Sequence, residues 1–461
     1  MKKKIIISII TLVLIMTGSF CIHNLNSNKI KENETENINT IEAVVLANVD
    51  DTLTIQDNNN VIYTLAFSNA EVEVGSTITI DYMGSLNKNI QLQKIKIIDY
   101  EQQPKQLNED GINEEWLDNG IFSKYYILAN NKLKTMTLDE KISQLFLVRY
   151  PTDSTAAEIQ KKYQFAGYVF FGKDFANKTE EEVKNMIQKV QDVSKIPMLT
   201  AVDEEGGTVV RVSNNFNLVD LPFKSPSALY QAGGFDLITQ DTIKKSTILS
   251  NLGLNLNLAP VVDVSTEPTD YMYDRSLQED TAITSEYSKT VIEASKNNNV
   301  SYTLKHFPGY GNNNDTHTGE VLDNRSYESI IKNDLPPFEA GINAGAEAIL
   351  VSHNIVVNID KDNPASLSPT IHNLLRNELD FTGIIITDDL AMGAITNLED
   401  ATVRAILAGN DLIITTDYET SIKSVKNAIN DKTISEDIID KLTFRVLSWK
   451  YYKGLIYENQ K

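Results

Sequence analysis

The sequence predicts an α/β fold, a (β/α)8 TIM-type barrel preceded by a small all-β module. Three observations lead to this prediction. Eight short apolar runs alternate with helical patterns over residues 114–461, as parallel strands joined by helices do. Residues 41–100 instead alternate apolar and polar positions with a period of two, which is typical of antiparallel strands. No glycine-rich phosphate-binding turn follows the first apolar run, although an open dinucleotide-binding sheet would carry one there.

The start of the chain has the pattern of an export signal. The lysines at 2–4 precede an apolar run from Ile5 to Phe20, which is shorter than the roughly 20 residues that span a membrane comfortably. Cys21, the only cysteine, follows directly and is similar in placement to the cysteine of a bacterial lipoprotein leader. Such leaders carry a small residue where Phe20 stands. Residues 1–21 are therefore expected to be a signal or lipoprotein leader, or an uncleaved membrane anchor. The protein is expected in the cell envelope, lipid-anchored at Cys21, or otherwise membrane-anchored or secreted.

A tether, a small β domain and a linker are expected next. Residues 22–40 are rich in Asn and Glu, which suits a flexible tether. In the domain at 41–100, Thr52–Ile55 and Val61–Leu65 flank a turn and predict a hairpin. Further strands are expected in a small barrel or sandwich, at Val72–Val74, Thr77–Ile80 and Ile90–Leu92. The domain carries no chemical motif and is interpreted as a spacer, with cell-wall binding as the alternative. Residues 101–113 are the expected linker.

The eight apolar runs are the expected barrel strands. In chain order they are Leu145–Val148, Gly167–Phe171, Met198–Val202, Leu254–Leu258, Ser301–Leu304, Ala348–Val351, Ile384–Ile386 and Leu412–Ile414. Helical patterns lie between them, for example at 179–193, 281–296 and 368–379. Ser368 and Pro369 predict the cap and first turn of the last of these helices.

Polar side chains follow these runs at the end where a barrel collects its chemistry. They include carboxylates, an amine and imidazoles: Asp203, Asp263, Lys305, His306, His353 and Asp388. Burying such a mixture costs several kcal/mol unless the groups are paired or functional. The pattern therefore predicts an active site at this rim.

Composition excludes several classes of function. The 63 acidic residues against 42 basic ones give a net charge of −21, which repels nucleic-acid phosphates. A single cysteine excludes an internal disulfide and a cysteine-based zinc site. A metal-dependent barrel hydrolase could use His306, His317, His353 and Asp388, but the His-x-His pair of many such barrels is missing and Lys305 would repel a cation. No metal or other cofactor is expected.

Six motifs occur in order along the barrel: Asp203–Gly207 with Arg211, Asn257–Val264, Asp274–Ser276, Lys305–Gly309, Asp315–His317 and Thr387–Met392. Together they resemble glycoside hydrolase family 3, in its β-N-acetylglucosaminidase (β-N-acetylhexosaminidase) branch. The resemblance covers essentially the whole barrel. A lone Glu-Gly-Gly would be weak evidence for the family, whereas six motifs in the same order are strong evidence. Because the sequence ends near Lys461, the second α/β sandwich of many members is expected to be absent, as it is from the single-barrel enzymes that the sequence resembles.

The resemblance implies catalytic roles for three residues. Asp388 matches the family nucleophile, whereas Asp389 is expected on the opposite side of the strand. His317 matches the acid/base, and Asp315 would orient and polarise it. A neutral imidazole exchanges protons near neutrality and adds no second negative charge beside the nucleophile. If His317 is not the proton donor, Glu204 and Glu205 are the next candidates.

Sugar binding is implied at five further positions, namely Asp203, Arg211, Arg275, Lys305 and His306. Carboxylates and cationic side chains suit sugar hydroxyls because they accept and donate strong hydrogen bonds. Asp263 is expected to support the site, and His353 either lines the pocket or acts from behind it. Residues 309–314 are expected to form a loop that closes over substrate to deliver His317. Tyr310 stands where the family commonly has His, which implies altered loop packing or leaving-group contact.

The sequence thus predicts an exported retaining β-N-acetylhexosaminidase that hydrolyses terminal β-linked N-acetylglucosamine from cell-wall or chitin-type oligosaccharides, through a covalent glycosyl-enzyme intermediate. Its expected partners are carbohydrate and, through the leader, a membrane. A family 3 β-glucosidase, β-xylosidase or glycoside phosphorylase is the alternative within the family. A non-catalytic sugar-binding lipoprotein is the alternative of another class, and the joint presence of Asp388, Asp315 and His317 argues against it.

Overall fold

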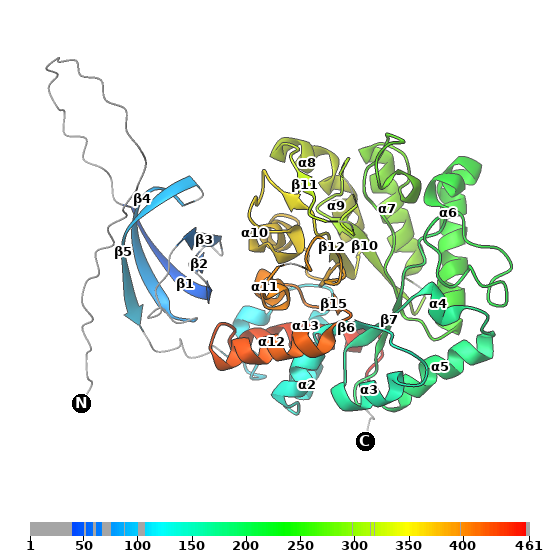
Figure 1. The fold of residues 1–461 in the computed structure, drawn as a ribbon, viewed down its shortest axis with the longest axis horizontal. Coiled ribbons are helices and arrows are strands. Elements are labelled where there is room, and N and C mark those ends of the chain that lie inside the picture. Colours follow the sequence, from blue (N-terminus) through cyan, green and yellow to red (C-terminus); the bar gives the residue numbers. More distant parts are fainter. Residues whose placement is uncertain are drawn as a thin grey trace, which may run out of the picture. The chain divides into compact units, whose positions relative to one another are not determined.

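The computed structural model describes residues 39–457 apart from 50, 51, 59, 60, 67–74, 87, 100–106, 297, 314, 318 and 397. The chain divides into two compact units, Met1–Pro104 and Lys105–Lys461 (Figure 1). Residues 107–113, which the sequence assigned to a linker, belong to the larger unit. The expected leader at 1–21 lies outside the described residues. Among the helices that are described, none is both long enough and apolar enough to span a membrane.

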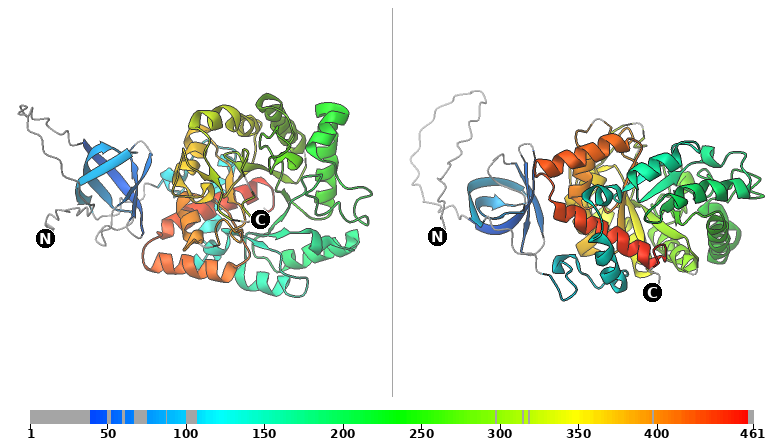
Figure 2. Two further views of the ribbon diagram at one scale, coloured as in Figure 1. Left: turned by 45° about the horizontal axis from the view of Figure 1, so that its top comes forward. Right: turned by 90° about the horizontal axis from the view of Figure 1, so that it is seen from below.

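The smaller unit is an antiparallel sheet, which confirms the predicted all-β module (Figure 2, blue strands). Its strands are β1 (Asn39–Val49), β2 (Thr52–Asp57), β3 (Ile62–Ala66), β4 (Thr77–Ser85) and β5 (Lys88–Asp99), in the order β3-β2-β1-β4-β5. The predicted hairpin is β2 with β3, and it pairs Ile55 with Tyr63. Alternate residues such as Leu53, Ile55 and Leu65 are buried in its core. The strand predicted at Val72–Val74 lies outside the described residues.

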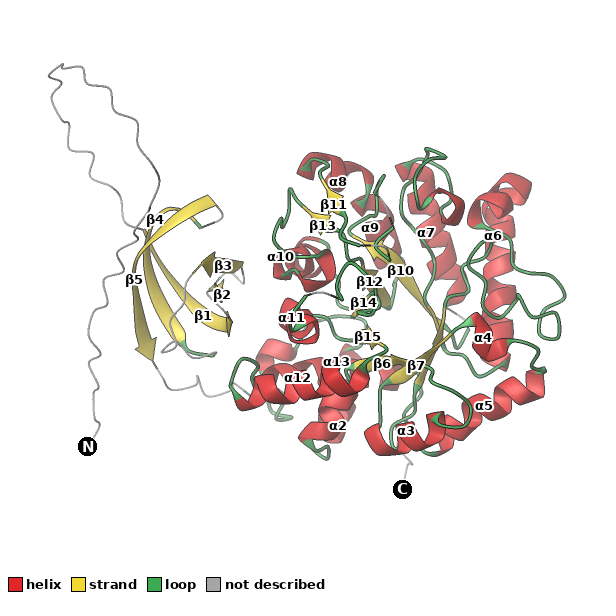
Figure 3. Cartoon of the chain, in the orientation of Figure 1, coloured by secondary structure: helices red, strands yellow, loops and turns green. Residues whose placement is uncertain are grey.

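The larger unit confirms the predicted (β/α)8 barrel (Figure 3). Its strands are β6 (Phe146–Arg149), β7 (Gly167–Phe170), β8 (Leu199–Val202), β9 (Leu256–Asn257), β10 (Ser301–Phe307), β12 (Ala348–Val351), β14 (Ile384–Thr387) and β15 (Ile413–Thr415). They follow one another in chain order, and every pairing is parallel. A parallel bridge between Ile386 and Leu412 closes the ring between β14 and β15. A short outer pair joins β11 (Leu322–Asp323) to β13 (Ile355–Val356).

Helices surround this barrel. They are α1 (Tyr126–Leu133), α2 (Leu138–Ser143), α3 (Ala156–Tyr163), α4 (Gly172–Phe175), α5 (Glu180–Asp192), α6 (Pro226–Asn251), α7 (Thr281–Ser295), α8 (Tyr327–Asn333), α9 (Leu335–Asn343), α10 (Pro369–Asn373), α11 (Ala401–Ala408), α12 (Tyr418–Asn430) and α13 (Glu436–Tyr452). The helices predicted at 179–193 and 281–296 are α5 and α7. Ser368 caps α10 as predicted, but the segment continues as a π-helix at Leu374–Glu378.

Strand side chains alternate between two cores, and this alternation positions the site. Leu147, Val169, Ala201 and Ile386 pack in one cluster inside the barrel, whereas their strand neighbours pack in another cluster against the helices. Two residues further along, the same inward direction is reached at Arg149, Phe171, Asp203 and Asp388. The carboxyl ends of the strands therefore present polar groups to the open end of the barrel, which we call the mouth.

Candidate active site

Lys305 on β10 connects two carboxylates at the mouth. Its Nζ lies 2.7 Å from Oδ1 of Asp203, directly after β8, and 2.7 Å from Oε1 of Glu205. The Lys305 side chain is only 4% exposed. Burial opposes its charge, but the two carboxylates raise the pKa of Lys305 above its ordinary value. Lys305 is therefore a fixed cation at the centre of the site.

Arg275 holds Glu205 from the other side. Its Nε and Nη2 donate to the Glu205 carboxylate at 2.9 and 2.7 Å, a bidentate pair. Burial opposes the charge of Glu205, but Arg275 and Lys305 together bring the pKa of Glu205 far below its usual range. Glu205 is therefore a fixed anion and a poor proton donor, contrary to the reserve role that the sequence gave it.

Glu204 is also unsuited to donate a proton, because it anchors a turn. Its buried carboxylate accepts from the backbone N–H groups of Arg211 at 2.8 Å and Val212 at 2.6 Å, and from the hydroxyl of Ser213. These bonds fold the segment after Glu205 back on itself. The turn brings Arg211, eight positions beyond Asp203 in the sequence, back to the mouth.

His306 is oriented by Asp263. The Nδ1 of His306 lies 2.7 Å from Oδ2 of Asp263, and a carboxylate only accepts, so Nδ1 carries the proton. The other ring nitrogen, Nε2, lies 3.4 Å from Nη2 of Arg275. Asp263 is 2% exposed, and its second oxygen accepts from the backbone N–H of Tyr310 at 2.7 Å. Asp263 thus supports His306 and the start of the next loop.

Two neighbouring carboxylates after β14 have opposite electrostatic environments. Burial disfavours the charge of Asp388, but His353, His306 and Lys305 lower its pKa below the ordinary value. Burial raises the pKa of Asp389, and the adjacent Asp388 raises it further. Oδ1 of Asp389 accepts from the backbone N–H of Ala391 at 2.9 Å and so caps a turn. Asp388 is therefore the ionised member of the pair that faces the mouth.

His353 at the end of β12 acts from behind the site. Its Nε2 lies 3.1 Å from the carbonyl oxygen of Asp389, so Nε2 donates, and Nδ1 accepts from the Ser366 hydroxyl at 2.7 Å. Burial lowers the pKa of His353 below its ordinary value. Of the two roles that the sequence left open, this geometry favours holding the backbone next to Asp388.

Asp315 and His317 form a dyad on the loop after β10. Nδ1 of His317 lies 2.6 Å from Oδ1 of Asp315, which also accepts the backbone N–H of His317 at 2.9 Å. Burial opposes ionisation of Asp315, but these two bonds lower its pKa below the ordinary value. The His317 side chain is 60% exposed. The dyad therefore presents a proton-exchanging imidazole, through Nε2, to solvent or substrate.

Tyr310 packs inside this loop. Its buried hydroxyl accepts the backbone N–H of Thr316 at 2.9 Å and bonds the Thr316 hydroxyl at 2.9 Å. The ring stacks edge-on against His306, with centroids 5.6 Å apart. This geometry favours the altered loop packing, of the two consequences expected for this position.

Sequence reasoning missed Arg149 and Phe171 at the mouth. The Arg149 guanidinium lies 4.1 Å from the centroid of the Phe171 ring, and that of Arg211 lies 5.8 Å from it. The Nε–H groups of both arginines are buried and, within the part of the chain that the structure describes, have no hydrogen-bond partner. The two-residue period along β6 and β7 is the signal that would have found Arg149 and Phe171.

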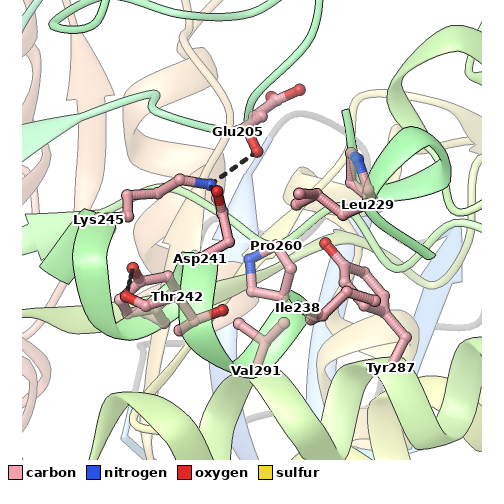
Figure 4. Close-up of a pocket in the computed structure, with 12 residues that line it drawn as sticks. Glu205, Leu229, Ile238, Asp241, Thr242, Lys245, Pro260, Tyr287 and Val291 are labelled. Atoms are coloured by element: carbon pink, nitrogen blue, oxygen red, sulfur yellow. Dashed lines mark hydrogen bonds and ion pairs between the residues drawn. The ribbon is translucent and has the colours of Figure 1, made fainter. Parts of the chain in front are cut away.

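A support layer lies behind Glu205 (Figure 4). Lys245 of α6 donates from Nζ to the backbone oxygen of Glu205 at 3.1 Å, and its charge is balanced by Asp241 at 3.3 Å. A cavity of about 20 Å³ beside them is lined by Pro260 and Tyr287, among others, and is large enough for a single water. The layer positions Glu205 and offers no room for a sugar.

The described side chains include no group of three or more His, Cys, Asp or Glu arranged to hold a metal ion. The mouth instead combines an ionised carboxylate, an imidazole dyad, and charged side chains around Lys305. A carboxylate nucleophile with a nearby proton-exchanging group suits displacement at an acetal carbon.

Comparisons with known proteins agree with this chemistry. A model of the glycosyl hydrolase family 3 N-terminal domain matches residues 137–449. A beta-hexosaminidase of Xanthomonas campestris is 30% identical over 233 residues, which cover 50% of this chain and 69% of the relative. A beta-hexosaminidase of Xylella fastidiosa is 27% identical over 291 residues, covering 62% of this chain and 86% of the relative.

Solved structures share the barrel. A family 3 beta-N-acetylglucosaminidase from Paenibacillus sp. has a TM-score of 0.65 at 26% identity, and the match covers 71% of this chain and 64% of that one. This chain therefore spans less than two thirds of the Paenibacillus structure. A beta-N-acetylhexosaminidase from Beutenbergia cavernae has a TM-score of 0.60 at 25% identity, covering 68% of this chain and 99% of that one.

Proposed function

Because the chain belongs to glycoside hydrolase family 3, we propose that it is an exported retaining β-N-acetylhexosaminidase. It removes terminal β-linked N-acetylglucosamine from cell-wall or chitin-type oligosaccharides through a covalent glycosyl-enzyme intermediate. The observation that carries the proposal is the combination of ionised Asp388 with an imidazole dyad, His317 bound to Asp315. Retaining hydrolysis requires these two functions, a nucleophile and a group that first gives and then takes a proton.

In the first step, Asp388 attacks the anomeric carbon and the bond from that carbon to the leaving oxygen breaks. Protonated His317 donates its Nε2 proton to the leaving oxygen, so that the aglycone departs as a neutral alcohol. Ionised Asp315 accepts from Nδ1–H and stabilises the positive charge of the ring. Because the pKa of Asp388 lies below its ordinary value, the nucleophile is charged throughout the neutral range.

In the second step, water attacks the anomeric carbon and releases the carboxylate of Asp388. Neutral His317 accepts the proton that the water loses, which returns the dyad to its starting state. An imidazole in this role places no second negative charge next to Asp388 when it is deprotonated. The exposed position of His317 suits both steps, because an aglycone must leave and a water must enter on the same side.

Charged side chains around Lys305 are assigned to the sugar hydroxyls. Lys305 and Arg275 are each bound to Glu205, which holds them in place before substrate arrives. Asp203 offers acceptors for two hydroxyls, while His306 offers Nε2. Arg211 contributes the guanidinium whose Nε–H has no partner among the described residues.

Paired substrates test the proposal. We expect kcat/KM to be at least about tenfold higher for a nitrophenyl N-acetyl-β-glucosaminide than for the matching β-glucoside or β-xyloside. The reverse ranking would assign a glucosidase or xylosidase instead. Repeating the assay in phosphate separates hydrolysis from phosphorolysis, because only a phosphorylase releases a sugar 1-phosphate. Sugar binding without turnover of any substrate would favour the non-catalytic sugar-binding lipoprotein.

The export part of the proposal rests on the lysines at 2–4 and the apolar run that ends at Phe20. Fractionation of cells that produce the full chain is expected to place it outside the cytoplasm. Detergent-dependent release that is lost in Cys21→Ala indicates lipidation, whereas unchanged membrane retention indicates an uncleaved anchor. Recovery of the full chain in the cytoplasm would contradict export.

A further inference from the structure

Two loops at the mouth of the barrel touch through their backbones. One loop follows β14 and begins at Asp388; the other follows β10 and carries His317. The backbone N–H of Ala394 in the first loop donates to the carbonyl oxygen of Thr316 in the second at 3.1 Å. The proposed nucleophile and the proposed acid/base therefore sit on segments that are in direct contact.

Gly393 lies where the two loops come closest. A Cβ atom built on Gly393 would lie 2.6 Å from the carbonyl oxygen of His317 and 3.3 Å from the amide nitrogen of Gly319. Both are backbone atoms, so no side-chain rotation relieves the contact. The φ angle of Gly393 is not in the left-handed region. This position therefore requires the missing side chain of glycine and not its backbone freedom.

The loop after β14 is tied to the barrel. The backbone N–H of Leu390 donates to the carbonyl oxygen of Ile414 on β15 at 3.0 Å, and that of Met392 donates to Asp389 at 2.9 Å. The carbonyl of Asp389 also accepts from His353. Because this loop is bonded to β15 and to His353, we expect added bulk at Gly393 to displace the opposite loop, which carries His317, more than it displaces Asp388.

We propose that Gly393 is a positioning residue that sets the separation of Asp388 and His317. The inference rests on the proposed function, since it uses the roles assigned to those two residues. Because Gly393 has no side chain, the carbonyl oxygen of His317 can lie against the Cα of Gly393. A methyl group there moves the acid/base away from the leaving oxygen, while the attack by Asp388 is preserved.

Gly393→Ala tests the inference against a matched control, Gly172→Ala. A Cβ on Gly172 would lie 3.8 Å from its nearest neighbour, which is ordinary contact. Each variant is assayed for kcat/KM, which reports the first step, with a nitrophenyl glycoside and with the N-acetylglucosamine disaccharide. We expect Gly393→Ala to lose about 10²-fold on the disaccharide and less than about threefold on the nitrophenyl glycoside. Gly172→Ala is expected to match the wild type on both.

The outcomes separate this inference from the proposed function. Equal losses of Gly393→Ala on the two substrates, or no loss on either, would overturn the role of Gly393. His317→Ala is measured in parallel: if it lacks the same selectivity, the assigned acid/base and the role of Gly393 both fail.

A second variant covers the case in which Gly393→Ala does not fold. Tyr310→Phe removes only the hydroxyl that holds Thr316. Tyr310→Phe is expected to show a smaller loss with the same selectivity, and an unselective effect would reject the inference.

Discussion

Both ends of the barrel bury charged side chains, but they do so differently. At the amino ends of the strands, which we call the floor, Asp411 accepts from Arg376 at 2.6 Å and from Arg445 at 2.8 Å. Further N–H groups of the two guanidiniums donate to backbone carbonyls at 381–383. Lys450 of α13 donates to Gln144 at 2.8 Å and to the carbonyl of Ala166 at 2.9 Å. The floor uses its buried charges to tie strand ends together.

The mouth also buries charged side chains but leaves hydrogen-bonding capacity open. Asp388 accepts one bond within the described residues, from the backbone N–H of Asp389 at 2.8 Å. The Nε–H groups of Arg149 and Arg211 have no partner there. Burial of charge therefore does not by itself indicate a site. Charges that remain incompletely bonded at the open end of the barrel do indicate one.

Asp388→Ala should give the largest effect of these variants, and we expect it to reduce activity without reducing stability. We expect kcat to drop by on the order of 10⁴-fold or more, because no covalent intermediate can form. Thermal unfolding should be unchanged or shifted upward, since a partly buried anion is removed from the mouth. If Tm falls together with activity, Asp388 holds the structure together as the charged residues of the floor do, and the prediction is wrong.

Asp411→Ala is the matching change at the floor, and we expect it to reduce stability. Removing this carboxylate leaves Arg376 and Arg445 buried without their shared anion, which costs about 3–5 kcal/mol of unfolding free energy. Urea denaturation measures the loss, and kcat of the protein that remains folded should stay within about twofold of wild type. Retained stability with lost activity would contradict the division between floor and mouth.

His317→Ala sharpens the contrast within the mouth. Loss of the proton donor should reduce turnover of the disaccharide about 10²-fold or more, while the first step with activated nitrophenyl substrates survives. Azide should partly rescue the variant, because it attacks the intermediate without help from a base. Asp315→Asn should give a milder form of the same profile, because the ring stays in place but loses stabilisation of its charge. Equal losses on all substrates without rescue would make the dyad structural.

The last expected effect, a pH dependence of stability, comes from Lys450. Burial lowers its pKa from 10.5 to about 7 in the folded protein, so between these values the unfolded chain binds more protons than the folded one. The unfolding free energy should therefore rise with pH over this window, by at most about 1.4 kcal/mol per pH unit. Below pH 7 both states carry the proton and this contribution is flat. Lys450→Met should remove the rise, and an unchanged pH profile would show that burial of Lys450 has no such effect.

The barrel could be predicted because its parallel strands are short, mostly apolar runs that alternate with helical patterns, and several of these runs are followed by polar residues. This local pattern located Asp203 and Asp388 directly after their strands, and Lys305 near the carboxyl end of β10, which continues to Phe307. Chain order alone then brought the three residues to one rim. The same pattern carried past Leu147 and Val169 would have predicted Arg149 and Phe171, which face the mouth by the same two-residue period.

Contacts between distant segments could not be predicted. The bidentate pair of Glu205 with Arg275 joins residues 70 positions apart, and nothing local distinguishes Glu205 from the turn-anchoring Glu204. The π-helix at Leu374–Glu378 replaces the last turns of a predicted α-helix, in a segment where Arg376 reaches Asp411, 35 positions away. Gly393 likewise has no local signal, because its neighbour His317 lies on another loop.

The proposed mechanism requires Asp388, and no other carboxylate, to form the covalent intermediate. Incubation with a 2-fluoro sugar that carries a good leaving group, followed by peptide mass spectrometry, should place the sugar on Asp388. The lowered pKa of Asp388 and the raised pKa of Asp389 predict this choice between adjacent residues. A label on Asp389 or on Glu205 would contradict the central claim, that the incompletely bonded carboxylate at the mouth is the nucleophile.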